Sequence, residues 1–157
     1  MSLTIGQMAP DFKLPDPGKK IHSLADYRGR NIVLFFFPAA WTGTCTKEMC
    51  TIQEDFNAYT EMNAVPIGIS VDMIFALKRF SEDFKLDGVT LLSDFNKEAI
   101  NAYGIVNNNF SIGYNGVAMR STFVIDKEGV LRFQEVLGAQ GDFPNMEAIK
   151  NAVKALG

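Results

Sequence analysis

The sequence predicts an α/β fold in which a central mixed β-sheet is flanked by helices. The first observation is a continuous apolar run from Asn31 to Phe37 (NIVLFFF), which is typical of a strand buried on both faces at the centre of a sheet. The second is the alternation of helical and strand-like segments after this run. The third is a pair of strand-like runs joined by Asp126-Lys127-Glu128-Gly129, which indicates an antiparallel hairpin. A strand–helix–strand unit followed by a hairpin and a last helix is expected to form a mixed sheet.

The other elements follow in order along the chain. Residues 1–30 are rich in proline and glycine, and they predict an extended arm or hairpin that precedes the main fold. Pro38 ends the first buried strand, and residues 45–63 have the spacing of a helix with one apolar face: Met49, Ile52, Phe56 and Tyr59. The later predicted elements are strands over 65–71, 89–92, 117–125 and 130–136, helices over 73–86, 96–103 and 145–156, and a long loop over 105–116. In the helix over 73–86, the candidate packing positions are Phe75, Leu77, Phe80 and Phe84.

Length and composition exclude several classes of function. The chain has 157 residues, of which 47% are hydrophobic, so we expect one domain over 1–157 with a single core. A net charge of −3 argues against nucleic acid or an anionic membrane as a partner, because both attract clustered lysine and arginine. The longest apolar run, Ile32 to Ala40, is too short to span a bilayer. The first residues lack the pattern of a secretory signal, so we expect a cytoplasmic protein.

The cysteine count restricts the chemistry further. Cys45, Cys50 and the lone His22 cannot supply the four ligands of a zinc site, and we expect no metal and no cofactor. Two cysteines are also too few for a disulfide scaffold. Carboxylates occur singly, and nothing indicates a hydrolase pair or a phosphate-binding loop. If the cysteines are functional, their chemistry is redox or nucleophilic.

Cys45 lies where an α/β fold places its ligands, at the carboxyl end of the buried strand and the start of a helix. If this helix begins near Thr42 or Gly43, Cys45 is in its first turn. Free backbone N–H groups and the positive end of the helix dipole there favour the thiolate, which is the nucleophilic form. The plain alternative is that Cys45 is a small buried apolar residue, with Thr42 as a helix cap, Pro38 as a strand terminator and Trp41 as a packing residue.

Three segments decide between these interpretations. Pro38-x-x-x-Thr42-x-x-Cys45 resembles the active-site motif of peroxiredoxins. Gly6-Gln7-Met8-Ala9-Pro10-Asp11-Phe12 resembles the N-terminal signature of that family, and Arg120-Ser121-Thr122-Phe123-Val124-Ile125-Asp126 resembles its distal strand. The segments occur in the family's order, so the resemblance covers nearly the whole chain. It implies a thioredoxin-like fold with an N-terminal extension and the activity of a thiol peroxidase.

The resemblance also implies roles for individual residues. Cys45 would be the peroxidatic cysteine, which attacks a peroxide and becomes a sulfenic acid. Arg120 would stabilise its thiolate, and Thr42 would hydrogen-bond the sulfur and the peroxide. Pro38 would close off the pocket, and Trp41 and Thr44 would line it. An apolar rim would admit organic hydroperoxides as well as hydrogen peroxide.

Cys50 follows Cys45 by five residues, a spacing that resembles the bacterioferritin-comigratory, or peroxiredoxin Q, subfamily. Some members of that subfamily have a resolving cysteine at this position, which would pair with Cys45 and be recycled by a thioredoxin-like reductant. Residues five apart on an intact helix are about 8–9 Å apart between Cα atoms, whereas a disulfide needs about 7 Å or less. Pairing therefore requires the first turns to unwind. The alternative is a one-cysteine enzyme in which Cys50 is structural.

The remaining predictions are less specific. We expect His22 to be exposed in a polar turn and Glu48 to be a solvated helix residue, although a glutamate here is common in the subfamily. The protein would be a monomer or homodimer. Two other functions remain open: disulfide exchange of the thioredoxin type, which usually uses a shorter cysteine spacing, and a non-catalytic, chaperone-like role.

Overall fold

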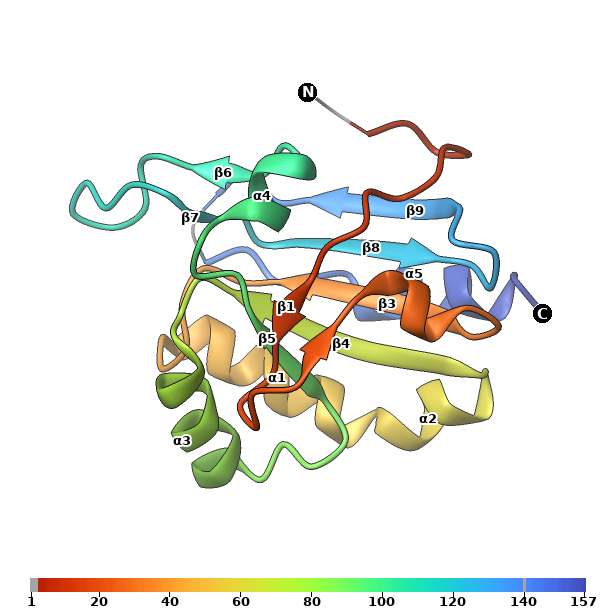
Figure 1. Cartoon of the computed structure of the whole chain (residues 1–157), viewed down its shortest axis with the longest axis horizontal. Coiled ribbons are helices and arrows are strands. Elements are labelled where there is room, and N and C mark those ends of the chain that lie inside the picture. Colours follow the sequence, from red (N-terminus) through yellow and green to blue (C-terminus); the bar gives the residue numbers. More distant parts are fainter. Residues whose placement is uncertain (1–2, 140) are drawn as a thin grey trace.

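A computed structural model describes residues 3–139 and 141–157. Its centre is a five-stranded mixed sheet in the order β5-β4-β3-β8-β9 (Figure 1). The strands are β3 (Asn31–Phe36), β4 (Ala64–Ser70), β5 (Thr90–Ser93), β8 (Ser121–Ile125) and β9 (Leu131–Val136). The β3, β4 and β5 strands run parallel, whereas β8 and β9 are antiparallel to their neighbours. The predicted mixed sheet is therefore confirmed.

The apolar run at β3 is the middle strand of this sheet. All six of its residues are buried, because β4 covers one edge, β8 covers the other, and side chains pack on both faces. Since the side chains of a strand alternate between faces, the run contributes to two separate cores. Ile32, Leu34 and Phe36 belong to one core, and Val33 and Phe35 belong to the other.

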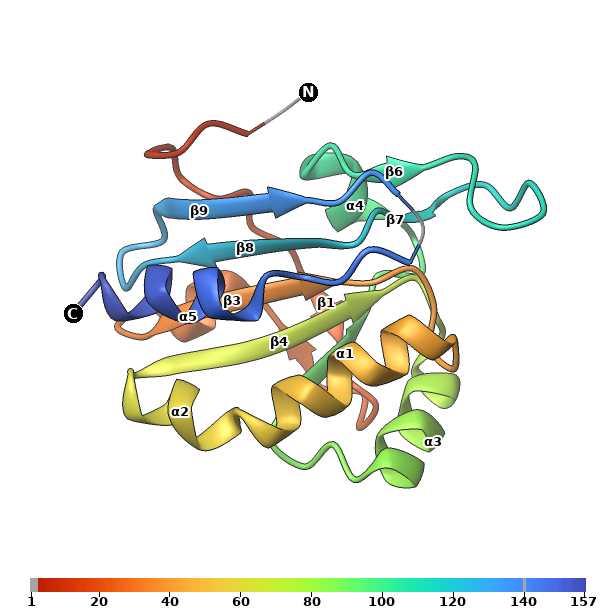
Figure 2. The same ribbon diagram turned by 180° about the vertical axis from the view of Figure 1, so that it is seen from behind.

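Helices cover the two faces of the sheet unequally. The α1 (Gly43–Glu54), α2 (Phe56–Glu61), α3 (Ile74–Phe84) and α5 (Met146–Lys154) helices contribute to the core that contains Val33 and Phe35. Figure 2 shows α1, α2 and α5 in front of the sheet, on the side opposite to the N-terminal segment. The other face is covered by α4 (Glu98–Ala102) and by the N-terminal residues. None of the helices within the described residues is long and apolar enough to cross a membrane.

The predicted arm over 1–30 contains the hairpin of β1 (Leu14–Pro15) and β2 (Ile21–His22), followed by the short 3-10 helix η1 (Leu24–Tyr27). The prediction that His22 is exposed is wrong. Its ring is buried, with Nδ1 2.7 Å from the Tyr27 hydroxyl and Nε2 2.8 Å from Asp16 Oδ2. One polar partner from the hairpin turn and one from η1 make burial of this imidazole possible, so His22 joins β2 to the turn before it and to η1.

Three predicted elements are divided differently in the structure. The helix predicted over 45–63 is two helices, because the chain leaves helical geometry at Asp55 between α1 and α2. The strand predicted over 117–125 is also divided: β7 (Val117–Ala118) pairs with β6 (Val106–Asn107), whereas β8 pairs with β3 and β9. The long loop therefore contains a strand. The N-terminal residues 1–2 and residue 140 of the predicted 1–157 domain lie outside the described residues.

The α3 helix confirms half of its predicted packing positions. Leu77 and Phe80 are fully buried, whereas Phe75 is 63% exposed and Phe84 is 37% exposed. A helix at the edge of a sheet buries a single stripe of side chains, and Phe75 lies outside that stripe.

Candidate active site

Cys45 lies in the first turn of α1, as the sequence predicted. The helix begins directly after Thr42, whose side chain accepts a hydrogen bond from the Cys45 N–H at 3.4 Å. The Thr42 hydroxyl also donates to the Ala39 carbonyl at 3.2 Å, so it joins the helix start to the loop that follows β3. The predicted hydrogen bond from Thr42 to the sulfur is not among these contacts. The Cys45 side chain is fully buried.

The loop between β3 and α1 is held by a residue that the sequence analysis missed. Asp72 follows β4, and its Oδ2 accepts hydrogen bonds from the Ala40 N–H and the Ser70 hydroxyl, both at 2.7 Å. The next residue in the loop, Trp41, has a φ of 76°, a conformation that costs free energy for a residue other than glycine. Asp72 could have been found from its place, because it follows the carboxyl end of a strand that neighbours β3.

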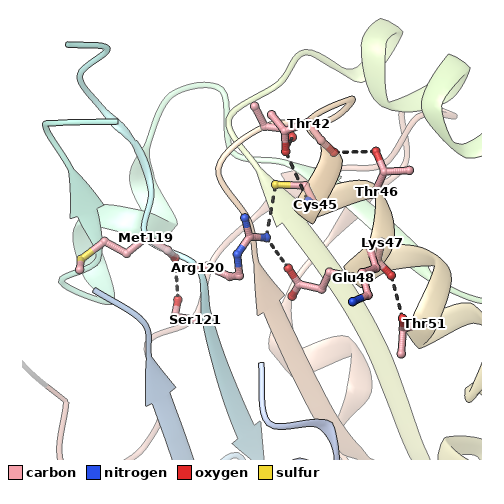
Figure 3. Close-up of polar contacts among 10 residues, drawn as sticks. Thr42, Cys45, Thr46, Lys47, Glu48, Thr51, Met119, Arg120 and Ser121 are labelled. Atoms are coloured by element: carbon pink, nitrogen blue, oxygen red, sulfur yellow. Dashed lines mark hydrogen bonds and ion pairs between the residues drawn. The ribbon is translucent and has the colours of Figure 1, made fainter. Parts of the chain in front are cut away.

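Arg120 reaches Cys45 because of the break between β7 and β8. Ser121, the first residue of β8, lies opposite Phe36 near the carboxyl end of β3, so the residue before it lies beside the loop after β3. The Arg120 side chain is buried, and its Nη1 donates to Cys45 Sγ at 3.3 Å (Figure 3). The predicted meeting of Arg120 and Cys45 is therefore present, across 75 positions of sequence.

The same Nη1 atom of Arg120 makes a second bond. It donates to Glu48 Oε1 at 2.7 Å, so one nitrogen joins a thiol and a carboxyl group (Figure 3). The prediction that Glu48 is solvated is wrong, because its side chain is fully buried. Glu48 is one helical turn after Cys45 on the face that also carries Met49 and Ile52, and this i,i+3 relation to Cys45 was visible in the sequence.

Burial changes the acidity of Glu48. Loss of hydration raises the pKa of its carboxyl group from 4.5 to about 7, although the charge of Arg120 opposes this effect. The nearby charge of Glu135, on β9, also raises the pKa. The second carboxyl oxygen, Oε2, has no hydrogen-bond partner among the described residues. An ionised carboxylate is therefore poorly satisfied at this position.

An open cavity of about 670 Å³ lies next to Arg120. Thr42, Gly43 and Thr44 line one part of it, and Phe110, Ser111 and Tyr114 from the segment between β6 and β7 line another. Pro38 lines a smaller space of about 20 Å³, which Arg120 also borders. Thr44 thus borders the open cavity and Pro38 the smaller space, and their roles at a substrate pocket stay predictions. Trp41 lines neither space; its ring packs against Phe80 and Phe84 of α3.

Cys50 lies on the same helix as Cys45 and is partly buried. Both thiols are free, and the helix between them is continuous. Burial, together with the nearby charge of Glu54, raises the pKa of the Cys50 thiol. The structure therefore has the geometry of the reduced protein, with the two cysteines on an intact α1.

A buried cysteine at a helix start, an arginine bonded to its sulfur and a mixed α/β sheet together define a class of thiol-dependent enzymes. The chain belongs to the AhpC/TSA family, whose model matches residues 5–134. It is 38% identical to Peroxiredoxin Bcp of Bacillus subtilis over 133 residues, which are 83% of each chain. It is 34% identical to the chloroplastic Peroxiredoxin Q of Triticum aestivum over 128 residues, which are 82% of this chain and 57% of that protein.

Solved structures agree with this family assignment. Peroxidoxin BcpB from Mycobacterium tuberculosis matches with a TM-score of 0.85 and 27% identity, covering 99% of both chains. A peroxiredoxin-like protein from Aquifex aeolicus matches with a TM-score of 0.89 and 26% identity, covering 99% of this chain and 89% of that one. The predicted thioredoxin-like fold and the predicted resemblance to the Bcp and peroxiredoxin Q group are both confirmed.

Proposed function

We propose that this protein is a thiol peroxidase that reduces hydrogen peroxide and organic hydroperoxides, with Cys45 as the nucleophile. The observation that carries the proposal is the hydrogen bond of 3.3 Å from Arg120 Nη1 to Cys45 Sγ. A permanently charged guanidinium at this distance favours the thiolate over the thiol. The free N–H groups of the first turn of α1 act in the same direction.

The contacts around the sulfur suggest how a peroxide is held. The Cys45 N–H makes only a long bond to Thr42, so this donor is available to a peroxide oxygen at little cost. Arg120 borders the cavity beside Thr42 and Thr44 and supplies a second, charged donor. Two donors aimed at the peroxide stabilise the negative charge that develops on the leaving oxygen. Aromatic side chains of Phe110 and Tyr114 on the cavity wall favour substrates with an apolar substituent.

Attack of the thiolate forms an S–O bond and breaks the O–O bond, which leaves a sulfenic acid on Cys45 and releases water or an alcohol.

We further propose that Cys50 attacks this sulfenic acid and that the resulting disulfide within one chain is reduced by a thioredoxin-like protein. Similarity of the chain to Peroxiredoxin Bcp and Peroxiredoxin Q supports the peroxidase activity. In the alternative cycle, Cys50 is structural and an external thiol reduces Cys45 directly. The enzyme would act in the cytoplasm as one domain, as a monomer or homodimer.

A peroxide-consumption assay with a dithiol reductant tests the central proposal. We expect Cys45→Ser to abolish turnover of hydrogen peroxide with an unchanged circular dichroism spectrum, because the hydroxyl is far less nucleophilic than the thiolate. Cys50→Ser is the matched control, since it removes a thiol of the same helix and keeps the first reaction with peroxide. Wild-type turnover by Cys45→Ser would show that another group is the nucleophile.

A further inference from the structure

The buried cluster of Cys45, Glu48 and Arg120 contains two groups that can become negative and one positive group. Both hydrogens of Arg120 Nη1 are used, one by the sulfur at 3.3 Å and one by Glu48 Oε1 at 2.7 Å. The Cys45 and Glu48 side chains are both fully buried, and Arg120 is 7% exposed. Arg120 is the single ion-pair partner of Glu48 among the described residues. With the thiolate and the carboxylate both ionised, the cluster carries a net negative charge away from water, which is costly.

We propose that Glu48 holds the proton that Cys45 releases, so that the cluster keeps one anion beside Arg120 at every stage of the reaction. In the resting state the proton is on Glu48, and the charge of Arg120 stabilises the Cys45 thiolate. When Cys45 becomes neutral, Glu48 gives up the proton and becomes the anion that pairs with Arg120. This inference rests on the proposed peroxidase function, and it assigns Glu48 a proton-holding role in that reaction.

Three features of Glu48 support this role. Its Oε2 has no partner among the described residues, which disfavours the ionised form more than the protonated one. Its neighbour Glu135 on β9 adds negative charge from a second element. Burial raises its pKa to about 7, so the proton can be exchanged near neutral pH. The titratable and charged groups around Glu48 are thus Cys45 on α1, Arg120 before β8, and Glu135 on β9.

The proton balance of the reaction gives this proton a destination. The sulfur donates an electron pair to the nearer peroxide oxygen, the O–O bond breaks, and its electron pair goes to the departing oxygen. The sulfur loses two electrons and the peroxide gains two. The neutral products, a sulfenic acid and water or an alcohol, contain one proton more than a thiolate and a peroxide. Glu48 supplies that proton, and the carboxylate left behind neutralises Arg120.

Infrared difference spectroscopy of the reduced protein at pH 7 tests the proposal, with ultraviolet absorbance of the thiolate recorded on the same sample. We expect the C=O stretch of one protonated carboxylic acid per chain wherever the thiolate is present. In Glu48→Gln this band should be lost while the thiolate remains, because glutamine keeps the acceptor oxygen and cannot ionise. Glu54→Gln is the matched control and should keep both signals, because Glu54 is an exposed glutamate at the end of the same helix. In Cys45→Ser the band should decrease, because Arg120 is then free to stabilise the Glu48 carboxylate.

A thiolate without a carboxylic acid band in the wild-type protein would overturn the proposal. The same band in wild-type and Glu48→Gln protein would also overturn it. If Glu48 only oriented Arg120, Cys45→Ser would lose the thiolate absorbance and keep the carboxylic acid band unchanged, which would also overturn the proposal. The experiment contains no peroxide, so a correct spectroscopic result with no peroxide turnover would count against the peroxidase function and not against the proton-holding pair.

Discussion

At the scale of single residues, burial of Glu48 has a consequence for stability. Folding raises the pKa of this carboxyl group from 4.5 to about 7, so the folded state prefers the protonated form. Its contribution to stability is therefore fully present below pH 4.5 and is lost as the pH rises through about 7. We expect the free energy of unfolding of the reduced protein, compared with that of Glu48→Gln, to fall over this range by up to about 3 kcal/mol.

Urea denaturation of both proteins at several pH values between 5 and 8 measures this difference. Glu54→Gln is a suitable control, because Glu54 is an exposed glutamate at the end of the same helix. Parallel stability curves for the wild-type protein and Glu48→Gln would contradict the prediction.

Some residues of this site could be predicted from local sequence patterns, and others could not. Pro38, Thr42 and Cys45 are close along the chain, and the start of one helix brings them together. Arg120 could be predicted only through its resemblance to a family segment, because it depends on the pairing of β8 with β3. The burial of Glu48 was predictable from the helix period alone, since Cys45, Met49 and Ile52 define a buried face that includes position 48. A general preference of glutamate for solvent outweighed this pattern.

At the scale of elements, the first turns of α1 control whether Cys45 can reach Cys50. The Thr46 hydroxyl donates to the Thr42 carbonyl at 2.7 Å, an i−4 contact that slightly destabilises a helix (Figure 3). Thr46→Ala removes this contact and increases helix propensity by a few tenths of a kcal/mol. We expect slower formation of the Cys45–Cys50 disulfide, by about two-fold, and more over-oxidation of Cys45 at high peroxide.

Mass spectrometry after one equivalent of peroxide and alkylation measures both outcomes. Thr51→Ala is a matched control, because Thr51 makes the same i−4 contact to Lys47 at 2.8 Å but lies beyond Cys50. A sulfenic acid on Cys45 together with an alkylated Cys50 in wild-type protein would show that Cys50 is structural.

The boundaries that sequence reasoning missed are places where tertiary contacts decide the conformation. The helical spacing continues through residue 59, yet the chain bends at Asp55, where the backbone has a ψ of 4°. The run over 117–125 has uniform strand propensity, but it changes partners from β6 to β3 and β9. A propensity pattern holds no information on partners, so it could not locate this break.

At the scale of the whole molecule, the distance between α1 and the sheet depends on Gly68 of β4. A Cβ atom at this position would lie 2.9 Å from Met49 Sδ and 2.9 Å from Leu91 Cδ2, so a side chain would push α1 away from the strand. We expect Gly68→Ala to lower the free energy of unfolding by about 1–3 kcal/mol, as overpacked cores do. Gly138→Ala is the control, because a Cβ atom there would contact nothing within 4 Å.

Urea denaturation of the two variants tests this prediction, and equal stability of Gly68→Ala and wild-type protein would contradict it.

The sequence was most informative about the architecture of the whole molecule. The order of strands and helices, the central place of the apolar run and the antiparallel hairpin all follow from local patterns. The division of the core between two faces also follows from alternation along β3.

Trp41 is an intrinsic fluorescent probe of this molecule. It is the only tryptophan of the chain, it directly precedes Thr42, the N-cap of α1, and its ring centre lies 5.4 Å from that of Phe80 and 5.7 Å from that of Phe84. Trp41 is 47% exposed, so a small displacement changes its contact with water. Unwinding of the first turns of α1 would draw the indole away from α3. The fluorescence of one native residue would then follow oxidation and reduction of the enzyme in real time, without a dye.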